Sequence, residues 1–339
     1  MKVLFIGGTG TISTAISRQL LAQGAELFLL NRGNRNQVLG GPVKELHCDI
    51  QNEAEAAEKI KDLSFDVTAD FIAFTQDQVE RDFRLFKDKT KQYIFISSAS
   101  AYQKPLSDYR VSESTPLANP YWQYSRDKIA CENFLFKKYR EEGFPLTVVR
   151  PSHTYDERSV PLGVHGKNGS WPVIKRMLEG KPVIIHGDGT SLWTMTANSD
   201  FARAFIGLMG NIHALGEAVQ ITSDETVTWN QVYQTIARVL GVPLKAVHIS
   251  SEFLALCGGA YDFTGSLLGD KANSLAFENT KLKRLVPDFT AQIRFDQGIR
   301  ATIEYIRSHP EYQRADPEFD AWCDRIIAAR EKAIRELTA

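Results

Sequence analysis

A glycine-rich turn near the start of the chain constrains its fold more than any other feature. Residues Gly7–Gly10 follow directly after the apolar run Val3–Ile6 and precede an amphipathic segment, Thr11–Gln23, which Gly24 ends. The order strand, glycine turn, helix is typical of the first βα unit of a parallel sheet, because glycine allows a tight turn and a close approach of backbone to phosphate. We therefore predict a unit that binds a dinucleotide at the start of its helix.

The residues of this turn have different predicted roles. Gly7 permits the tight turn, and Gly10 lets backbone N–H groups approach a pyrophosphate at the positive end of the helix. Ser13 stands where the dinucleotide fingerprint has its third glycine, and serine is small enough for close packing there. The predicted cofactor contacts in this turn are Gly7, Thr9, Gly10, Thr11 and Ile12. The alternative is an ordinary strand-to-helix turn without a ligand.

Strands and helices continue to alternate through the first half of the chain. The further predicted strands are the apolar runs Glu26–Leu30, Val43–His47, Val67–Phe74, Tyr93–Ser97 and Leu146–Val149. The predicted helices between them are Glu53–Lys61, Val79–Lys87 and Tyr121–Glu142. This alternation predicts an α/β fold with a Rossmann-type, doubly wound parallel sheet.

The sequence changes character after Arg150-Pro151. The segment Ser152–Thr196 is rich in Gly, Pro, Trp and His, and we expect mostly loops there, with a helix near Val173–Leu178. A helix at Phe201–Met209 and a strand at Ala218–Thr222 are expected to return to the sheet. The remaining predicted helices are Trp229–Leu240, Phe253–Leu256, Thr280–Leu285, Gln297–Ser308 and Pro317–Leu337. We predict a dinucleotide-binding domain over residues 1–155, which residues 197–225 rejoin, and a smaller C-terminal substrate-binding lobe within residues 156–339.

Composition argues against several classes of function. The chain has 40 Lys and Arg residues against 41 Asp and Glu, so nothing in its bulk charge attracts it to nucleic acid or to an anionic membrane. No segment approaches the roughly 18 apolar residues that a membrane-spanning helix needs. The four cysteines and seven histidines show no metal-ligand spacing. We expect a cytoplasmic protein with a small-molecule substrate and with no metal, nucleic-acid or membrane partner.

The end of the second predicted strand indicates which dinucleotide binds. An acidic residue there would hold the ribose 2′-hydroxyl of NAD, but this chain has Asn31, followed by Arg32 and Arg35. Two guanidinium groups could pair with the 2′-phosphate of NADP, and no carboxylate repels it. The sequence therefore favours NADP, with NAD possible. The alternative is that both arginines belong to a solvated loop.

Asp49 and Ile50 follow the third predicted strand. Asp49 could accept a hydrogen bond from the adenine amino group while Ile50 covers the face of the ring. Asp49 could equally cap the N-terminus of the next helix. The sequence leaves both roles open.

A tyrosine and a lysine lie four residues apart in the longest predicted helix of the first half. This spacing places Tyr124 and Lys128 on one face. A phenol with a pKa of about 10 is a poor base at neutral pH, and a nearby ammonium group lowers that pKa. Ser98 and Ser100 follow the apolar strand that ends at Ser97, and ligands bind at the carboxyl ends of parallel strands. We expect these hydroxyl groups to face the crevice that Tyr124 faces, although they could merely cap the strand.

The motifs together resemble the extended short-chain dehydrogenase/reductase superfamily, specifically the NAD-dependent epimerase/dehydratase family. The matching segments, which span about residues 1–305, are Gly7–Gly10, Asp49-Ile50, Ser97–Tyr102, Tyr124 with Lys128, Arg150-Pro151, His186–Thr190, Asp200–Ala202 and Asn279–Leu282. The resemblance implies that Tyr124 is the catalytic acid/base, that Lys128 orients the nicotinamide ribose and that Ser98 hydrogen-bonds the reacting oxygen, with Ser100 as a second candidate. It also implies Pro151 and His153 beside the nicotinamide, and a homodimer. The alternative for His153, as a lone histidine, is a structural role.

The chain departs from the family pattern where the family binds its substrates. Dehydratases of the family carry an Asp-Glu pair at the positions of Ala99-Ser100, so sugar dehydration is not expected. Trp193 and Leu267-Leu268 occupy the positions of two arginines that clamp the diphosphate of nucleotide sugars. Charge for a diphosphate would have to come from Arg158, Lys167 or Lys271. The predicted substrate contacts are Thr75, Ser100, Tyr155, Lys167 and Trp193. The aromatic rings among them, with Trp171, could stack on a sugar, or each could equally be a core residue.

These observations predict hydride transfer at a secondary alcohol or ketone of a sugar-like small molecule. The sequence does not separate a reductase from an epimerase. The alternative is a catalytically silent dinucleotide-binding protein that acts in regulation or RNA binding. The presence of Tyr124, Lys128 and Ser98 and the balanced charge argue against that alternative.

Overall fold

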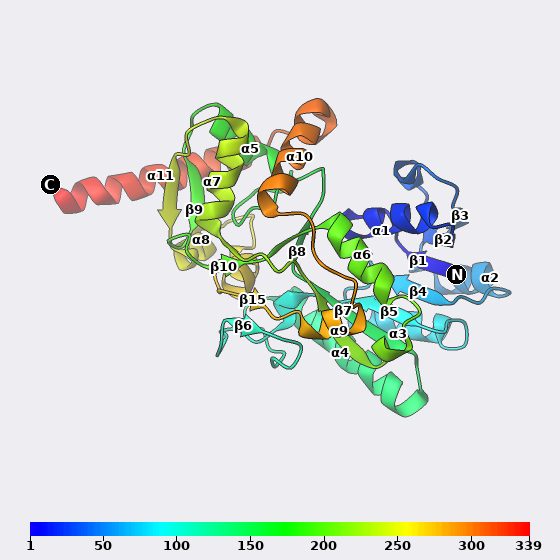
Figure 1. Cartoon of the computed structure of the whole chain (residues 1–339). Helices are drawn as coiled ribbons and strands as arrows, with labels where there is room; N and C mark the ends of the chain where they lie inside the picture. Colours follow the sequence, from blue (N-terminus) through cyan, green and yellow to red (C-terminus); the bar gives the residue numbers. More distant parts are fainter. The chain divides into compact units, whose positions relative to one another are not determined.

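The computed structural model describes the backbone of residues 1–339 and every side chain except that of Gln37. The chain divides into two compact units, each built from several segments of the sequence (Figure 1). The first comprises Met1–Thr154, Thr196–Asp224 and Phe277–Gln292. The second comprises Tyr155–Met195, Glu225–Ala276 and Ile293–Ala339.

A seven-stranded parallel sheet forms the centre of the first unit. Across the sheet the strands are β12 (Glu217–Ile221), β7 (Leu146–Pro151), β5 (Tyr93–Ile96), β4 (Val67–Asp70), β1 (Lys2–Ile6), β2 (Glu26–Asn31) and β3 (Lys44–His47). The chain runs outward from β1 through β2 to β3 and then returns to β4 on the other side of β1. This order confirms the predicted doubly wound α/β fold, and it makes the carboxyl ends of β1 and β4 the expected ligand site.

Helices cover both faces of this sheet. The helices of the first unit are α1 (Thr11–Ala22), α2 (Glu53–Ile60), α3 (Gln76–Phe86), α4 (Gln123–Glu142), α6 (Asn198–Leu208) and α9 (Thr280–Leu285), with the 3₁₀ helices η1 (Asn36–Leu39), η2 (Ala99–Ala101) and η3 (Ile212–Ala214). Successive side chains of β1 point to opposite faces. Val3 and Phe5 pack in one core with α1 and α6, and Leu4 and Ile6 pack in another with α3 and α4. Burial on both faces explains why the strands are continuous apolar runs.

The strand predicted over Val67–Phe74 is shorter in the structure and ends at Asp70. The Asp70 carboxylate accepts hydrogen bonds from the backbone N–H groups of Ile72 and Ala73 at 2.9 and 3.0 Å. These bonds turn the chain out of the sheet, although the residues that follow are apolar. Polar capping therefore overrides the apolar pattern at this position.

The second unit contains the helices α5 (Trp171–Leu178), α7 (Trp229–Leu240), α8 (Ser251–Cys257), α10 (Phe295–Ser308) and α11 (Pro317–Thr338), the π-helix η4 (Thr264–Lys271) and the 3₁₀ helix η5 (Pro310–Tyr312). In it β9 (Val183–His186) pairs in parallel with β14 (Ala246–Ile249), and β10 (Leu192–Trp193) pairs antiparallel with β13 (Val227–Thr228). The chain has four further short strands, which are β6 (Arg110–Val111), β8 (His153–Tyr155), β11 (Met195–Ala197) and β15 (Ala276–Phe277). The sequence analysis missed these strands because runs of two to four residues show no measurable periodicity.

The described residues contain neither a membrane-spanning helix nor a cluster of metal ligands. None of their helices combines the length and the apolar character that crossing a membrane requires. No group of three or more His, Cys, Asp or Glu side chains among them could hold a metal ion.

Candidate active site

The turn between β1 and α1 has backbone conformations that favour glycine. Gly7 and Gly8 have φ angles of 102° and 99°, where any other residue would be strained. A Cβ atom on Gly8 would also lie 2.6 Å from Leu29 Cδ2. Gly10 has a φ of −86°, which any residue can adopt, and its N–H donates to the Ser13 hydroxyl at 2.9 Å. Ser13 therefore contributes a hydrogen bond to the turn, beyond the small size predicted from the sequence.

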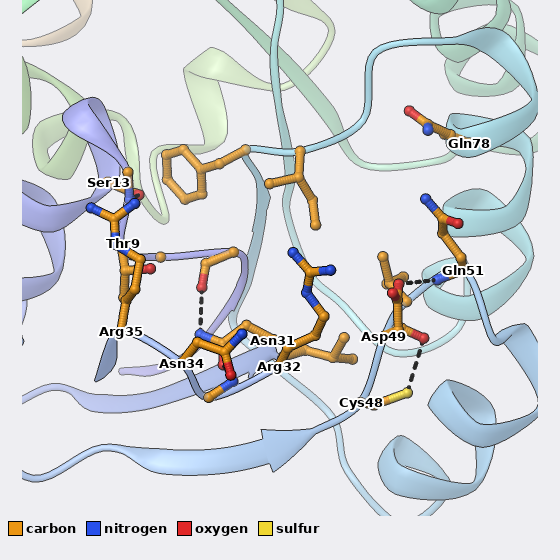
Figure 2. Close-up of a pocket in the computed structure, with 18 of the residues that line it drawn as sticks. Thr9, Ser13, Asn31, Arg32, Asn34, Arg35, Cys48, Asp49, Gln51 and Gln78 are labelled. Carbon is orange, nitrogen blue, oxygen red and sulfur yellow. Dashed lines mark hydrogen bonds between the residues drawn. The ribbon is translucent and has the colours of Figure 1, made fainter. Parts of the chain in front are cut away.

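A cavity of about 510 Å³ opens beside this turn (Figure 2). Of the predicted cofactor contacts, the lining includes Gly7, Thr9, Gly10, Asn31, Arg32, Arg35, Asp49 and Ile50. Thr11, Ile12, Lys128, Pro151 and His153 are not part of it. Lining residues that the sequence analysis did not select include Phe71, Ile72 and Phe74 after β4, and Gln78 and Arg81 on α3. These residues follow β4, and ligands of such sheets bind where the strand order reverses, here between β1 and β4. This rule could have identified them from the sequence.

The side chain of Asn31, at the end of β2, forms hydrogen bonds that connect parts of the cavity wall. Its side-chain N–H₂ donates to Gly7 O at 3.0 Å and to Asn36 Oδ1 at 2.8 Å, and its oxygen accepts from Gly33 N at 2.7 Å. Both N–H groups are thus used within the protein. Only one lone pair of the amide oxygen is left for a ribose hydroxyl group.

Arg32 and Arg35 extend from the segment after β2 toward the cavity, as Figure 2 shows. Both are exposed, and among the described residues neither pairs with a carboxylate. Guanidinium groups that line a cavity and have no acidic partner are suited to binding an anionic group.

Asp49 does not cap the helix that follows it. Its carboxylate accepts a hydrogen bond from Gln51 N at 3.1 Å, and the N-cap of α2 is Asn52, which accepts from Glu55 N. The alternative role as a helix cap is therefore wrong. Ile50 is buried in the cavity wall.

Asp70 is a buried residue of this region that the sequence analysis placed within a strand. It fixes the turn after β4, and its second oxygen accepts a hydrogen bond from Tyr93 Oη at 2.9 Å. On α3, Arg81 binds Asp82 through two hydrogen bonds of 2.8 and 3.0 Å. Burial, together with the nearby Asp70 carboxylate, raises the pKa of Asp82 well above its usual range. Asp70 could have been identified from the sequence, because it is an acidic residue at the end of an apolar run.

Lys128 on α4 is almost fully buried, with 2% of its surface exposed. Its ammonium group donates to Ala73 O and Ile96 O, both at 2.7 Å, and therefore connects α4 to the ends of β4 and β5. The rings of Phe74 and Phe95 face it at 4.6 and 4.8 Å. Burial lowers the pKa of Lys128 to about 8, although the Asp70 carboxylate opposes this shift. One of the three N–H groups is left for a ligand.

Tyr124 lies one turn before Lys128 on the same face of α4, with the Lys128 ammonium 5.9 Å from its ring centre. Trp122 and Phe74 flank the ring, with centroids 4.9 and 6.2 Å away. The phenol is thus close to a cation and between two aromatic rings.

Three serine hydroxyls form a hydrogen-bonded chain that starts at Ser125, the residue after Tyr124. Ser125 Oγ donates to Ser100 Oγ at 2.7 Å, and Ser100 Oγ lies 2.9 Å from Ser98 Oγ. Ser98 Oγ also accepts from Ser100 N at 3.1 Å and caps η2. The structure therefore brings both predicted serines together, and adds Ser125, which the sequence analysis did not select.

A buried ion pair anchors α4 one turn beyond Lys128. Glu132 binds Arg150 of β7 through bonds of 2.6 and 3.0 Å, and it accepts from Ser97 Oγ at 2.5 Å. Glu132 is 1% and Arg150 4% exposed. The pair fixes the helix against the carboxyl ends of β5 and β7.

Several predicted substrate contacts have other roles in the structure. Thr75 is the N-cap of α3, where its hydroxyl donates to Asp77 at 2.5 Å and its N–H donates to the Gln78 side chain. In the second unit, Trp193 packs against Trp229 and is 2% exposed, and Tyr155 packs against Phe295 and is 4% exposed. These rings are core residues of their unit, which argues against stacking on a substrate.

The charged side chains of the second unit that could bind a diphosphate differ in whether they are paired, buried or exposed. Arg158 is paired with Asp156, and Lys271 is buried with its ammonium 3.3 Å from Ser266 O. Lys167 is exposed. Leu267, at one of the positions where the family carries an arginine, is fully buried in η4.

Comparison with known proteins gives matches along most of the chain. A model described as the NAD dependent epimerase/dehydratase family matches residues 3–221. The 2′-dehydrokanamycin reductase of Streptomyces kanamyceticus is 24% identical over 260 residues, which cover 75% of this chain and 71% of that protein. The chloroplast stem-loop binding protein of 41 kDa b of Arabidopsis thaliana is 26% identical over 255 residues, which cover 71% of this chain and 64% of that protein.

The fold is shared with solved structures at lower identity. The structure of a UDP-glucuronic acid 4-epimerase from Bacillus cereus, in complex with UDP-glucuronic acid and NAD, superposes with a TM-score of 0.72 at 19% identity. The match covers 91% of this chain and 99% of that one.

Proposed function

Because this chain belongs to the NAD-dependent epimerase/dehydratase family, we propose that it transfers hydride between a nicotinamide dinucleotide and a secondary alcohol or ketone of a sugar-like small molecule. The observation that carries the proposal is the arrangement on α4. There the Tyr124 ring lies 5.9 Å from the Lys128 ammonium, which itself binds the ends of β4 and β5.

The residues of the first unit fit a dinucleotide. Side chains are excluded at Gly7 and Gly8 by backbone conformation, and at Gly8 also by the packing of Leu29, so the turn presents bare backbone to the cavity. The same cavity is lined by Arg32 and Arg35, which pair with no carboxylate in the part of the chain that the structure describes. In this proposal Gly7–Gly10 hold the pyrophosphate, Asp49 and Ile50 hold the adenine, and Lys128 uses its remaining N–H for the nicotinamide ribose. When bound, the nicotinamide supplies or accepts the hydride.

The chain's own residues move the proton. In the oxidation direction Tyr124 phenolate removes the proton of the substrate hydroxyl, and in the reduction direction Tyr124 returns a proton to the carbonyl oxygen. The Lys128 cation stabilises the phenolate form between these steps. Ser98 donates a hydrogen bond to the same oxygen and stabilises the negative charge that develops on it. The rings of Phe74 and Trp122 flank the ring of Tyr124.

We propose NADP as the preferred form of the cofactor. The support is Asn31 in place of an acidic residue, together with the exposed guanidinium groups of Arg32 and Arg35 at the cavity. Replacing Arg32 with alanine should weaken NADPH binding about 10- to 100-fold and leave NADH binding within about twofold, because only the 2′-phosphate is lost as a partner. Arg18→Ala, on α1 with its side chain bonded to Val38 O, is the matched control. Equal NADPH binding by wild type and Arg32→Ala would remove the argument.

A sugar-like substrate is supported by the aromatic rings beside the phenol. Phe74 and Trp122 offer apolar faces next to Tyr124, and the C–H face of a sugar ring packs well on such surfaces. The positions where the family carries its diphosphate-binding arginines hold the buried Trp193 and Leu267. We therefore propose that the substrate need not carry a nucleoside diphosphate. We also propose the homodimer that the family resemblance implies.

The test is a turnover screen with NADPH and NADH over keto sugars, aminoglycoside ketones, sugar lactones, and UDP- and dTDP-sugars. Absorbance at 340 nm detects net redox, and chromatography of the sugar detects epimerisation without cofactor consumption. Tyr124→Phe should lower kcat by about 100-fold or more, while Tyr121→Phe, an exposed phenol just before α4, should not. Unchanged activity of Tyr124→Phe would refute the proposal. Dinucleotide binding with no turnover, together with salt-sensitive RNA retention, would instead support the silent RNA-binding role.

A further inference from the structure

We propose that Ser125 and Ser100 are positioning residues that fix Ser98 as a hydrogen-bond donor to the reacting oxygen of the substrate. This inference rests on the proposed function and adds two residues to it. Its basis is the direction of the hydrogen bonds in the serine chain, which can be followed from the buried end outward.

The chain starts at a fully buried hydroxyl. Ser125 is 0% exposed, and its only hydroxyl proton is donated to Ser100 Oγ at 2.7 Å. Ser100 is 3% exposed, and the next oxygen within hydrogen-bond distance of its hydroxyl is Ser98 Oγ at 2.9 Å. If Ser98 were the donor of this bond, the buried Ser100 proton would have no acceptor, because Ser125 Oγ already donates to Ser100. An unpaired buried O–H is costly, so we infer that Ser100 donates to Ser98.

Ser98 then has both of its acceptor sites filled. One accepts the Ser100 hydroxyl, and the other accepts Ser100 N at 3.1 Å. A serine oxygen has two lone pairs and one proton, so the Ser98 proton must point in the remaining direction. Ser98 is the partly exposed member of the three, so its proton is the one that can reach a ligand.

The backbone around the chain keeps this geometry in place. Asn119, which is 3% exposed, donates to Ser100 O at 2.8 Å, and its oxygen accepts from Tyr121 N and Trp122 N just before α4 begins. The loop that carries Ser100 is therefore tied to the start of the helix that carries Tyr124 and Ser125. A shift of either element would break the chain.

The fixed direction matters because the same oxygen changes from a carbonyl to an alkoxide-like state during the reaction. A donor stabilises the developing negative charge, whereas a hydroxyl free to present its lone pair would repel it. Donation along a chain of hydroxyls also polarises each O–H in turn, which strengthens the last donor. Ser100 and Ser125 thus act on the substrate through Ser98, without touching it.

A neutron structure tests the proposal without any substrate. In crystals of the full chain exchanged into D₂O, the Ser125 deuteron should point to Ser100 Oγ, the Ser100 deuteron to Ser98 Oγ, and the Ser98 deuteron away from both. A Ser98 deuteron directed at Ser100 Oγ would overturn the proposal, whatever reaction the enzyme catalyses.

A double-mutant cycle tests the consequence for catalysis, with the best substrate of the turnover screen. Ser98→Ala should lower kcat about 100-fold, and Ser125→Ala about 10-fold, with the cofactor KM unchanged. In the Ser98→Ala background, Ser125→Ala should have no further effect, because the donor it orients is gone. Ser114→Ala, which removes an exposed hydroxyl pair, is the control, and circular dichroism confirms folding of each variant.

The two tests separate the proposals. A tenfold loss on Ser125→Ala in both backgrounds would show a merely structural role and overturn the positioning inference alone. Full activity of Tyr124→Phe would overturn the proposed function, and the neutron result would still decide the direction of the serine chain.

Discussion

Replacing Lys128 with methionine should change how the stability of the folded chain depends on pH. Burial lowers the pKa of Lys128 to about 8 in the folded protein, whereas an unfolded lysine titrates near 10.4. Between these values the unfolded state binds more protons than the folded state. Stability therefore rises with pH through this window, and the gain is lost as the pH falls through about 8.

The size of the effect follows from the two pKa values. One pKa unit corresponds to about 1.4 kcal/mol, so burying Lys128 costs about 3 kcal/mol at pH 7, where it stays mostly charged, and about 1 kcal/mol at pH 10, where it is neutral in the folded state. Lys128→Met lacks this dependence. The stability of the variant relative to wild type should therefore be about 2 kcal/mol more favourable at pH 7 than at pH 10. The loss of bonds to Ala73 O and Ile96 O cancels in this difference, because it does not depend on pH.

Urea unfolding of both proteins at pH 7, 8, 9 and 10 measures this difference. Lys137→Met, an exposed position on the same helix, is the matched control and should follow wild type at every pH. Burial raises the pKa of the neighbouring Cys131 to about 12, so that thiol stays protonated in the folded state. Its titration in the unfolded state is common to both proteins and cancels in the difference. A constant difference between Lys128→Met and wild type from pH 7 to pH 10 would refute the reasoning. Such a result would mean that burial does not lower the pKa of Lys128 in the folded protein.

Three further substitutions test separate parts of the site. Glu132→Gln leaves Arg150 buried without its partner and should lower the free energy of unfolding by about 3–5 kcal/mol in urea titrations; a loss under about 1 kcal/mol would contradict the buried ion pair. Gly8→Ala adds strain at positive φ and a clash, and should abolish the dinucleotide binding that calorimetry measures. Gly143→Ala, at positive φ with open space around it, should only reduce stability by about 1 kcal/mol. Thr75→Ala should reduce stability by about 1 kcal/mol with the substrate KM unchanged. A raised KM at unchanged stability would instead support Thr75 as a substrate contact.

The sequence predicted the features that depend on neighbours along the chain. The glycine turn, the helix after it and the i, i+4 spacing of Tyr124 and Lys128 are local patterns, and local patterns report secondary structure directly. The apolar runs predicted the sheet because its strands are buried on both faces. The helix Thr280–Leu285 has the predicted bounds for the same reason.

Features that depend on contacts between residues far apart in the sequence could not be predicted from local patterns. Asp70 ends a strand by capping the turn after it, although the residues that follow are apolar. Trp193 and Tyr155 lie in a segment rich in loop formers, and nothing in that segment shows that tertiary packing buries their rings. The chain from Ser125 through Ser100 joins residues 25 positions apart, and no periodic pattern records such a pair.

The helix α4 explains why one stretch of sequence carries so much of the candidate site. Tyr124, Lys128 and Glu132 repeat at intervals of four residues, so they form one stripe along a single face. Lys128 and Glu132 each bind the carboxyl end of a different part of the sheet, and a stripe with this spacing would ordinarily be apolar in a helix packed on a sheet. Placing charges there costs stability, as the lowered pKa of Lys128 records. The benefit is that the helix cannot slide or rotate without breaking a buried charged contact, so the phenol of Tyr124 is held at the edge of the sheet where a dinucleotide would bind.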